Sequence, residues 1–166
     1  MKEKKKTADV LIEGISDIIL PVIPLLTASG IMKGLLLLLA ALKVLSSESE
    51  TYLVLDAIAD SAFYFLPVLL AVTASKKFRT STFTAVAVAC VLLYPTLTAV
   101  LEAGEDLHFL GLPMKGVIYH SSVIPILLTV VLLHYVEGFF HKHLPELSES
   151  SLTPLFSVLV CSLAAL

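Results

Sequence analysis

Five long apolar blocks determine what this chain of 166 residues can fold into. They cover approximately residues 18–42, 60–74, 84–103, 121–140 and 152–166. A helix rises about 1.5 Å per residue, so about 20 apolar residues cross the hydrocarbon core of a membrane. Only 15% of the residues are charged, whereas roughly a quarter are charged in soluble domains. The sequence therefore predicts an all-α, polytopic bundle of transmembrane helices.

The lengths of the blocks predict four complete spans and a truncated fifth. The second block is long enough only if it starts near Leu53, which brings Asp56 and Asp60 into it. The fifth block is short for a span. Ahead of the first block, acidic residues recur every four positions at Asp9, Glu13 and Asp17. This pattern favours a short amphipathic helix at the membrane surface over an irregular leader.

Basic residues gather at alternate ends of the blocks, which predicts an orientation. Eight of them precede the first block or follow the second and fourth: Lys2, Lys4, Lys5, Lys6, Lys76, Lys77, Arg79 and Lys142. The other connections hold only Lys43 and Lys115. The positive-inside rule then places the N-terminus in the cytoplasm, with residues 1–8 as a basic cytoplasmic tail.

A few polar side chains interrupt the apolar blocks. Asp56, Asp60 and Tyr64 follow one another at intervals of four residues, and Lys33 is the other charge within a block. Charged groups in lipid are costly, so they face a bundle interior, a cavity or a partner. We expect Asp60 and Lys33 to be buried polar contacts. The alternatives are a helix-start cap for Asp60 and a lysine stem that extends to the interface for Lys33.

Small and helix-breaking residues also lie within the blocks. Gly30 and Gly34 flank Lys33 and form a small-xxx-small pattern that lets helices approach each other. Every block contains a proline: Pro21, Pro24, Pro67, Pro95, Pro125 and Pro154. Such prolines predict bent helices around an interior, which is typical of transporters and channels.

No catalytic residue, metal site or cofactor is expected from the remaining pattern. His120, Ser121 and Ser122 are interpreted as a polar entry to the fourth block. The histidine-rich stretch "HYVEGFFHKH" has neither spacing of the zinc motifs H-E-x-x-H and H-x-x-E-H. Cys90 and Cys161 lie in apolar blocks and are expected to pack as small apolar residues. A net charge of -3 gives no indication of a nucleic-acid partner.

Several phrases in a fixed order resemble one known family. They are "ISDIILPVIPLLTASGIMKGLL", "AIADSAFYFLPVLLAVTASKKF", "VLLYPTL", "FLGLPM" and "YHSSVIPILLTVVLLHYVEGFFHKHLPE". Together they resemble the N-terminal half of enzyme IIC, the membrane permease of bacterial sugar phosphotransferase systems. The similarity is to the β-glucoside, sucrose and trehalose branch of the glucose superfamily, and it covers the chain from about Asp9 onward.

The resemblance implies a permease in the bacterial inner membrane that carries a sugar while IIB and IIA phosphocarrier domains or proteins supply the phosphoryl group. It implies that residues 9–166 are the scaffold and dimer-contact half, surrounded by lipid and forming a homodimer. The sugar-contacting residues, including a glutamate in a Gly-Ile-Thr-Glu-Pro-like motif, belong mainly to the second half, which this sequence lacks. The chain is therefore expected to be a truncated permease that neither acts as an enzyme nor transports sugar by itself.

Two other functions remain open at this point. The chain could serve as a dimerising or regulatory membrane partner of an intact permease, or it could be an unrelated small ion channel. A fragment, a split gene and an early stop would each account for the missing half.

Overall fold

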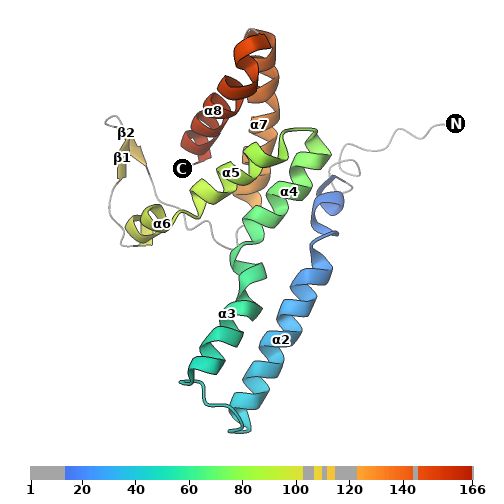
Figure 1. The fold of residues 1–166 in the computed structure, drawn as a ribbon, viewed down its shortest axis with the longest axis vertical. Helices are drawn as coiled ribbons and strands as arrows, with labels where there is room; N and C mark the ends of the chain where they lie inside the picture. The colour runs from blue at the N-terminus through green and yellow to red at the C-terminus, as the bar shows by residue number, and fades with distance from the viewer. Residues whose placement is uncertain (1–13, 103–106, 110–111, 115–122, 144–145, 166) are drawn as a thin grey trace, which may run out of the picture. The chain divides into compact units, whose positions relative to one another are not determined.

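The structure is a computed structural model that describes residues 14–102, 107–109, 112–114, 123–143 and 146–165. The chain divides into two compact units, Met1–Leu66 and Pro67–Leu166, which are described separately below. Figure 1 shows the order of the elements along the chain.

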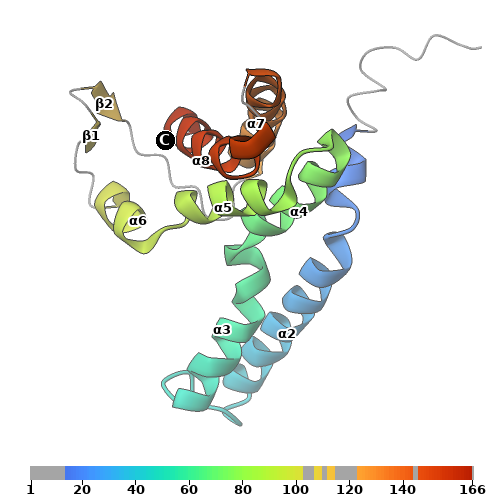
Figure 2. The ribbon, with the colours of Figure 1, turned by 45° about the horizontal axis from the view of Figure 1, so that its top comes forward.

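The first unit is a pair of helices that lie side by side. Residues 14–19 are helical and are followed by α2 (Ile23–Ala41) and α3 (Glu50–Tyr64), which pack against each other (Figures 1 and 2). Lys43 closes α2 in the left-handed conformation, with φ 56°, and the Val44 N–H then donates to the Leu39 carbonyl. The Ser49 hydroxyl oxygen starts α3 by accepting the Tyr52 N–H at 3.2 Å.

The second unit contains the remaining helices and one short hairpin. They are α4 (Leu66–Phe78), α5 (Thr82–Leu92), α6 (Pro95–Glu102), β1 (Leu107–Phe109), β2 (Leu112–Met114), α7 (Ile124–His143) and α8 (Glu146–Ala165). Helix α8 lies along α7 and also packs against α5 (Figure 2). β1 and β2 pair antiparallel, with Phe109 opposite Leu112. The predicted all-α class is confirmed, and the hairpin is an addition that the sequence analysis did not predict.

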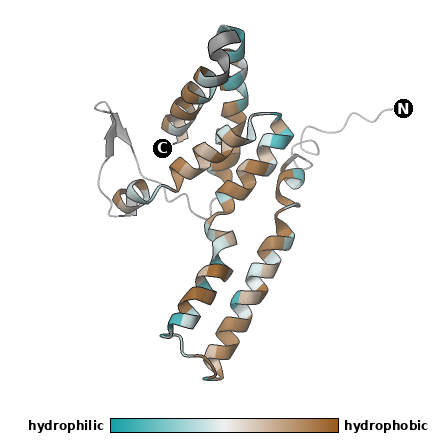
Figure 3. Cartoon of the chain, viewed as in Figure 1, coloured by the Kyte–Doolittle hydropathy of each residue, from teal (hydrophilic) through white to brown (hydrophobic). Residues whose placement is uncertain are grey.

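The number of predicted spans is confirmed. Four helical stretches are long and apolar enough to cross a membrane: Ile23–Ala41, Glu50–Phe78, Thr82–Val100 and Ile124–His143. A shorter apolar helix, Ser151–Ala165, corresponds to the expected incomplete fifth span. Hydrophobic colours predominate along α2 and α4 in Figure 3. Residues 9–13 of the expected surface helix lie outside the described residues.

Most of the prolines lie at the starts of helices, and two of them also fall within candidate spans. Pro24, Pro67, Pro95 and Pro125 each occupy the first or second residue of a helix, and among the described helices only α8 has an internal proline, Pro154. First-turn N–H groups have no partner within their own helix, so proline loses no hydrogen bond there. Pro24 and Pro125 therefore mark only the starts of their spans. Pro67 and Pro95 instead fall within the candidate spans Glu50–Phe78 and Thr82–Val100, where the helix is interrupted between α3 and α4 and between α5 and α6. The expected disruption is present in these two spans and is not present in every span.

Small side chains form much of the buried core of the second unit. Ala71 and Ala74 of α4 are fully buried, and so are Ala85 and Ala89 of α5. Small residues allow membrane helices to approach closely, since packing rather than water exclusion holds them together. By contrast, α2 buries only Ser29 and Leu36. Most of its leucines, such as Leu35 and Leu37, are exposed as expected for a helix in contact with lipid or with another membrane helix.

Candidate functional site

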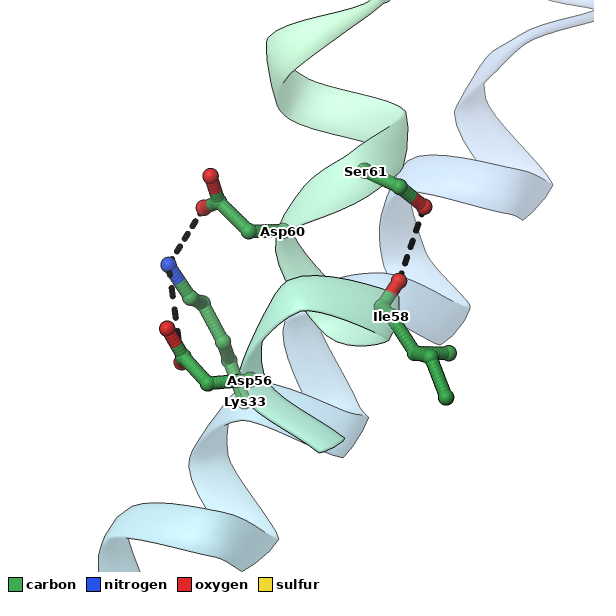
Figure 4. A network of polar contacts seen from close by, with 5 residues as sticks. All are labelled: Lys33, Asp56, Ile58, Asp60 and Ser61. Carbon is green, nitrogen blue, oxygen red and sulfur yellow. Dashed lines mark hydrogen bonds and ion pairs between the residues drawn. The ribbon is translucent and has the colours of Figure 1, made fainter. Parts of the chain in front are cut away.

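An ion pair joins the two helices of the first unit. The Lys33 ammonium on α2 donates a hydrogen bond to Asp60 Oδ1 on α3, and its Nζ atom lies 3.9 Å from Asp56 Oδ1. Figure 4 shows the lysine reaching both carboxylates. Asp56 and Asp60 are four residues apart, so they share one side of α3. We call Lys33, Asp56 and Asp60 the charged triad.

Lys33 and Asp60 are not buried within the described chain as the sequence analysis expected. The side chains are 36% exposed at Lys33, 41% at Asp56 and 42% at Asp60. The ion pair lies on the side of α2 and α3 and is partly open among the described residues. Lys33 was expected either to pair with a carboxylate or to extend its stem to the membrane interface, and in the structure it pairs with a carboxylate. Asp60 lies well inside α3, so the helix-start cap belongs to Ser49 instead.

Tyr64, Gly30 and Gly34 are also exposed in this chain. Tyr64 is 37% exposed, and its ring meets the Phe65 ring edge-on with centroids 5.0 Å apart. A Cβ added at Gly30 would lie 3.9 Å from Phe63 Cζ, which is an ordinary contact, and one added at Gly34 would meet nothing within 4 Å. Gly30 and Gly34 therefore make no close helix–helix contact within the described first unit.

A buried glutamate that the sequence analysis did not select joins two helices of the second unit. Glu137 of α7 is 6% exposed, and its Oε2 accepts the backbone N–H of Ser81 at 3.0 Å. Ser81 is the N-cap of α5, and its hydroxyl oxygen accepts the Thr84 N–H at 3.3 Å. The carboxylate thus lies at the positive end of the α5 dipole. In the sequence, Glu137 is a single carboxylate in an apolar block, within the histidine-rich stretch considered above only for metal binding.

Helix α8 presents a buried polar side to its neighbours. Thr153, Ser157 and Cys161 recur every four residues and are almost inaccessible to solvent. The hydroxyls of Thr153 and Ser157 have no hydrogen-bond partner in the described part of the chain. The Phe140 and Phe156 rings stack with centroids 5.3 Å apart, and this contact sets the register of α8 against α7. Small polar residues therefore serve here as packing residues.

The basic residues of the predicted orientation lie at helix ends. Lys76 and Lys77 are in the last turn of α4, Lys142 is in the last turn of α7, and Arg79 follows α4 in a left-handed conformation with φ 56°. All four are exposed. Positive charge at a helix C-terminus is favourable because of the helix dipole. The predicted polar entry, His120, Ser121 and Ser122, lies outside the described residues.

The histidines at the end of α7 interact with their own helix. His143 Nδ1 lies 2.8 Å from the Phe139 carbonyl oxygen, and its ring stacks on the Phe139 ring with centroids 4.3 Å apart. Within the described ranges, no three His, Cys, Asp or Glu side chains are grouped so that they could hold a metal ion.

Four apolar spans, tied together by an ion pair and a tertiary helix cap, define a multi-pass membrane protein. Residues 16–166 match the family model "Phosphotransferase system, EIIC". The chain therefore belongs to the EIIC family of the phosphotransferase system, which confirms the resemblance seen in the sequence, and it is a multi-pass bacterial membrane protein.

Curated relatives from several bacteria are similar to nearly the whole chain. The β-glucoside-specific EIIBCA component of Bacillus subtilis is 35% identical over 94% of this chain and 26% of the relative. The sucrose-specific EIIBC component of the same organism is 32% identical over 99% of this chain and 36% of the relative. The arbutin-, cellobiose- and salicin-specific EIIBC component of Escherichia coli is 34% identical over 86% of this chain and 30% of the relative. The chain thus spans about a quarter to a third of these relatives. No solved structure gives a significant match.

Proposed function

We propose that this chain is a membrane permease component of a phosphoenolpyruvate-dependent sugar phosphotransferase system. The observation that carries the proposal is the match of residues 16–166 to the EIIC family model. The sugar is proposed to be of the β-glucoside or sucrose class, because similar relatives are named for β-glucosides and for sucrose. Residues 9–166 constitute the scaffold half of the permease in this proposal.

The chain is proposed to need further parts of the phosphotransferase system for both transport and chemistry. Its relatives are three to four times longer, as the 26% and 36% coverages imply. The names of those relatives include EIIB and, in the β-glucoside component, EIIA besides EIIC. We assign the phosphoryl transfer to such EIIB and EIIA partners and assign no catalytic role to this chain.

Sugar uptake by membrane vesicles tests this function. Vesicles that contain this chain are supplied with phosphoenolpyruvate and the soluble phosphotransferase proteins, and radiolabelled salicin and sucrose are offered separately. We expect no accumulation of sugar phosphate from the chain alone. Accumulation is expected once the remainder of the B. subtilis sucrose EIIBC component is added as a second polypeptide. Sugar-independent ion currents from the chain alone would instead identify a channel.

We further propose that the chain forms a homodimer within the lipid membrane through its first unit. The support is the exposed Gly30–Gly34 side of α2, where a Cβ built at Gly34 meets nothing within 4 Å from the other described parts of the chain. Gly34→Leu should then yield monomers, measured by light scattering of the solubilised protein. Gly138→Leu is the matched control, since Gly138 also meets nothing within 4 Å. A dimer that persists in Gly34→Leu would exclude this surface.

A further inference from the structure

The charged triad lies in the middle of the membrane-spanning part of the first unit. Lys33 is ten residues after Ile23 and eight before Ala41, the two ends of a candidate span. At about 1.5 Å per residue, these separations correspond to about 15 Å and about 12 Å. Asp56 and Asp60 reach Lys33 from α3, so all three charges lie away from the ends of α2.

The triad carries an excess negative charge that no further ion pair among the described residues balances. Two carboxylates share one ammonium group, which leaves a formal charge of -1. Lys33 makes its hydrogen bond to Asp60, so Asp56 is the carboxylate left with a single, longer contact of 3.9 Å among the described residues. Ser61 on the same helix donates its hydroxyl to the Ile58 carbonyl and contributes nothing to the triad (Figure 4).

The open side of the triad is unsuited to lipid. About two fifths of each carboxylate side chain is exposed, 41% at Asp56 and 42% at Asp60. Ionised carboxylates within membrane spans face protein or water because lipid cannot solvate them. A second copy of this chain would bring a triad with the same net charge, and like charges repel across an interface. The complementary neighbour is one that brings positive charge.

We propose that the α2–α3 side carrying Lys33, Asp56 and Asp60 is a docking surface for a membrane helix that supplies an arginine or lysine side chain to Asp56. This inference rests on the proposed function, since it places that helix in the part of the permease that the longer relatives contain beyond their match to this chain. The donor completes the pairing of Asp56 and removes the triad from lipid.

Accessibility measurements on two spin-labelled positions test the docking surface. Leu53 lies three residues before Asp56, on the same side of α3, and Ile58 lies two residues after it, on the opposite side. Both side chains are exposed, at 69% and 52%. A nitroxide is attached to Leu53→Cys or to Ile58→Cys, with Cys90 replaced by alanine. Its collision rates with oxygen and with a water-soluble nickel chelate are then measured in vesicles.

The expected result is a change at one position only. Adding the remainder of the B. subtilis sucrose EIIBC component should lower both collision rates several-fold at position 53 and leave position 58 unchanged. An oxygen rate at position 53 that stays high would show lipid contact and overturn the proposal. A high nickel rate would show a water-filled space and also overturn it. The proposal would also be overturned if raising the concentration of this chain alone lowered both collision rates at position 53. A second copy of the chain would then be the occupant of the surface.

Charge variants identify the chemistry of the partner. Asp56→Lys should weaken association with the remainder by about tenfold or more, because like charges would face each other, whereas Asp56→Glu should preserve it. Glu48→Lys, an exposed change of the same sign in the loop before α3, is the matched control. Equal affinity of Asp56→Lys and Asp56→Glu would refute a cationic partner. Sugar uptake by the same vesicles is measured separately. If both collision rates fall at position 53 but no sugar is taken up, the docking surface stands and only the proposed function is contradicted.

Discussion

At the scale of single residues, Glu137 shows how one carboxylate can fix a helix that is distant in sequence. The N–H of Ser81 lies at the N-cap of α5 and has no partner in its own helix. Glu137 accepts it from α7, 56 positions along the chain. A capping glutamate usually comes from within the same helix, so a search for local motifs does not find this one.

Removing the carboxylate should destabilise the second unit. Glu137→Ala removes the charged acceptor of the Ser81 N–H, and a hydrogen bond to a charged group contributes about 1.5–3 kcal/mol. Glu137→Gln keeps an amide oxygen at a similar position, so its loss should be smaller. Unfolding of the purified chain in mixed micelles, followed by circular dichroism, measures both. An alanine variant as stable as the wild type would show that the contact contributes nothing to stability.

At the scale of elements, α8 shows that polar composition and burial are compatible in a membrane helix. Its buried side consists of small residues, and the Ser157 side chain is fully inaccessible while its hydroxyl has no hydrogen-bond partner in the described part of the chain. Small size rather than hydrogen bonding explains a serine at this position, because α8 must approach both α7 and α5.

Two substitutions at Ser157 separate size from polarity. Ser157→Ala removes only the unpaired hydroxyl, so stability should stay within about 1 kcal/mol of the wild type or rise. Ser157→Leu overfills a closely packed contact and should cost about 1–3 kcal/mol. The same micelle unfolding assay compares the two. If the alanine variant lost as much stability as the leucine variant, the hydroxyl would have to make a contact that this packing does not include.

The elements themselves were predicted more accurately than their ends. Apolar length alone located all four candidate spans, because about 20 apolar residues have few other uses. The second span starts at Glu50 instead of Leu53, since the hydroxyl of Ser49 caps it. The effect of each proline was only partly predictable, because it depends on whether the residue starts a span, as Pro125 does, or falls within one, as Pro67 does.

At the scale of the whole molecule, the contacts that tie the helices together depend on tertiary packing and were only partly predictable. Lys33 and Asp60 could be named as intramembrane charges, but their pairing requires α2 and α3 to be neighbours in a particular register. Their exposure could not be read from the sequence, because it depends on what else packs against the pair. Glu137 was not identified, because its partner is a backbone group.

The orientation in the membrane is the last property that the charge pattern predicts. Ser47 lies in the turn between α2 and α3, after one crossing, and His143 ends α7, after four crossings. Both are exposed. With the N-terminus in the cytoplasm, an odd number of crossings places Ser47 outside and an even number places His143 inside, beside the exposed Lys142.

Cysteine labelling in whole cells measures this arrangement directly. In a chain with Cys90 replaced by alanine, Ser47→Cys should react with an impermeant maleimide in intact cells. His143→Cys should react only after the membrane is opened. The reverse pattern would place the N-terminus outside despite its lysines. Labelling of both positions from the same side would mean that the stretch between them does not cross the membrane three times. In that case at least one of the spans Glu50–Phe78, Thr82–Val100 and Ile124–His143 would not cross the bilayer.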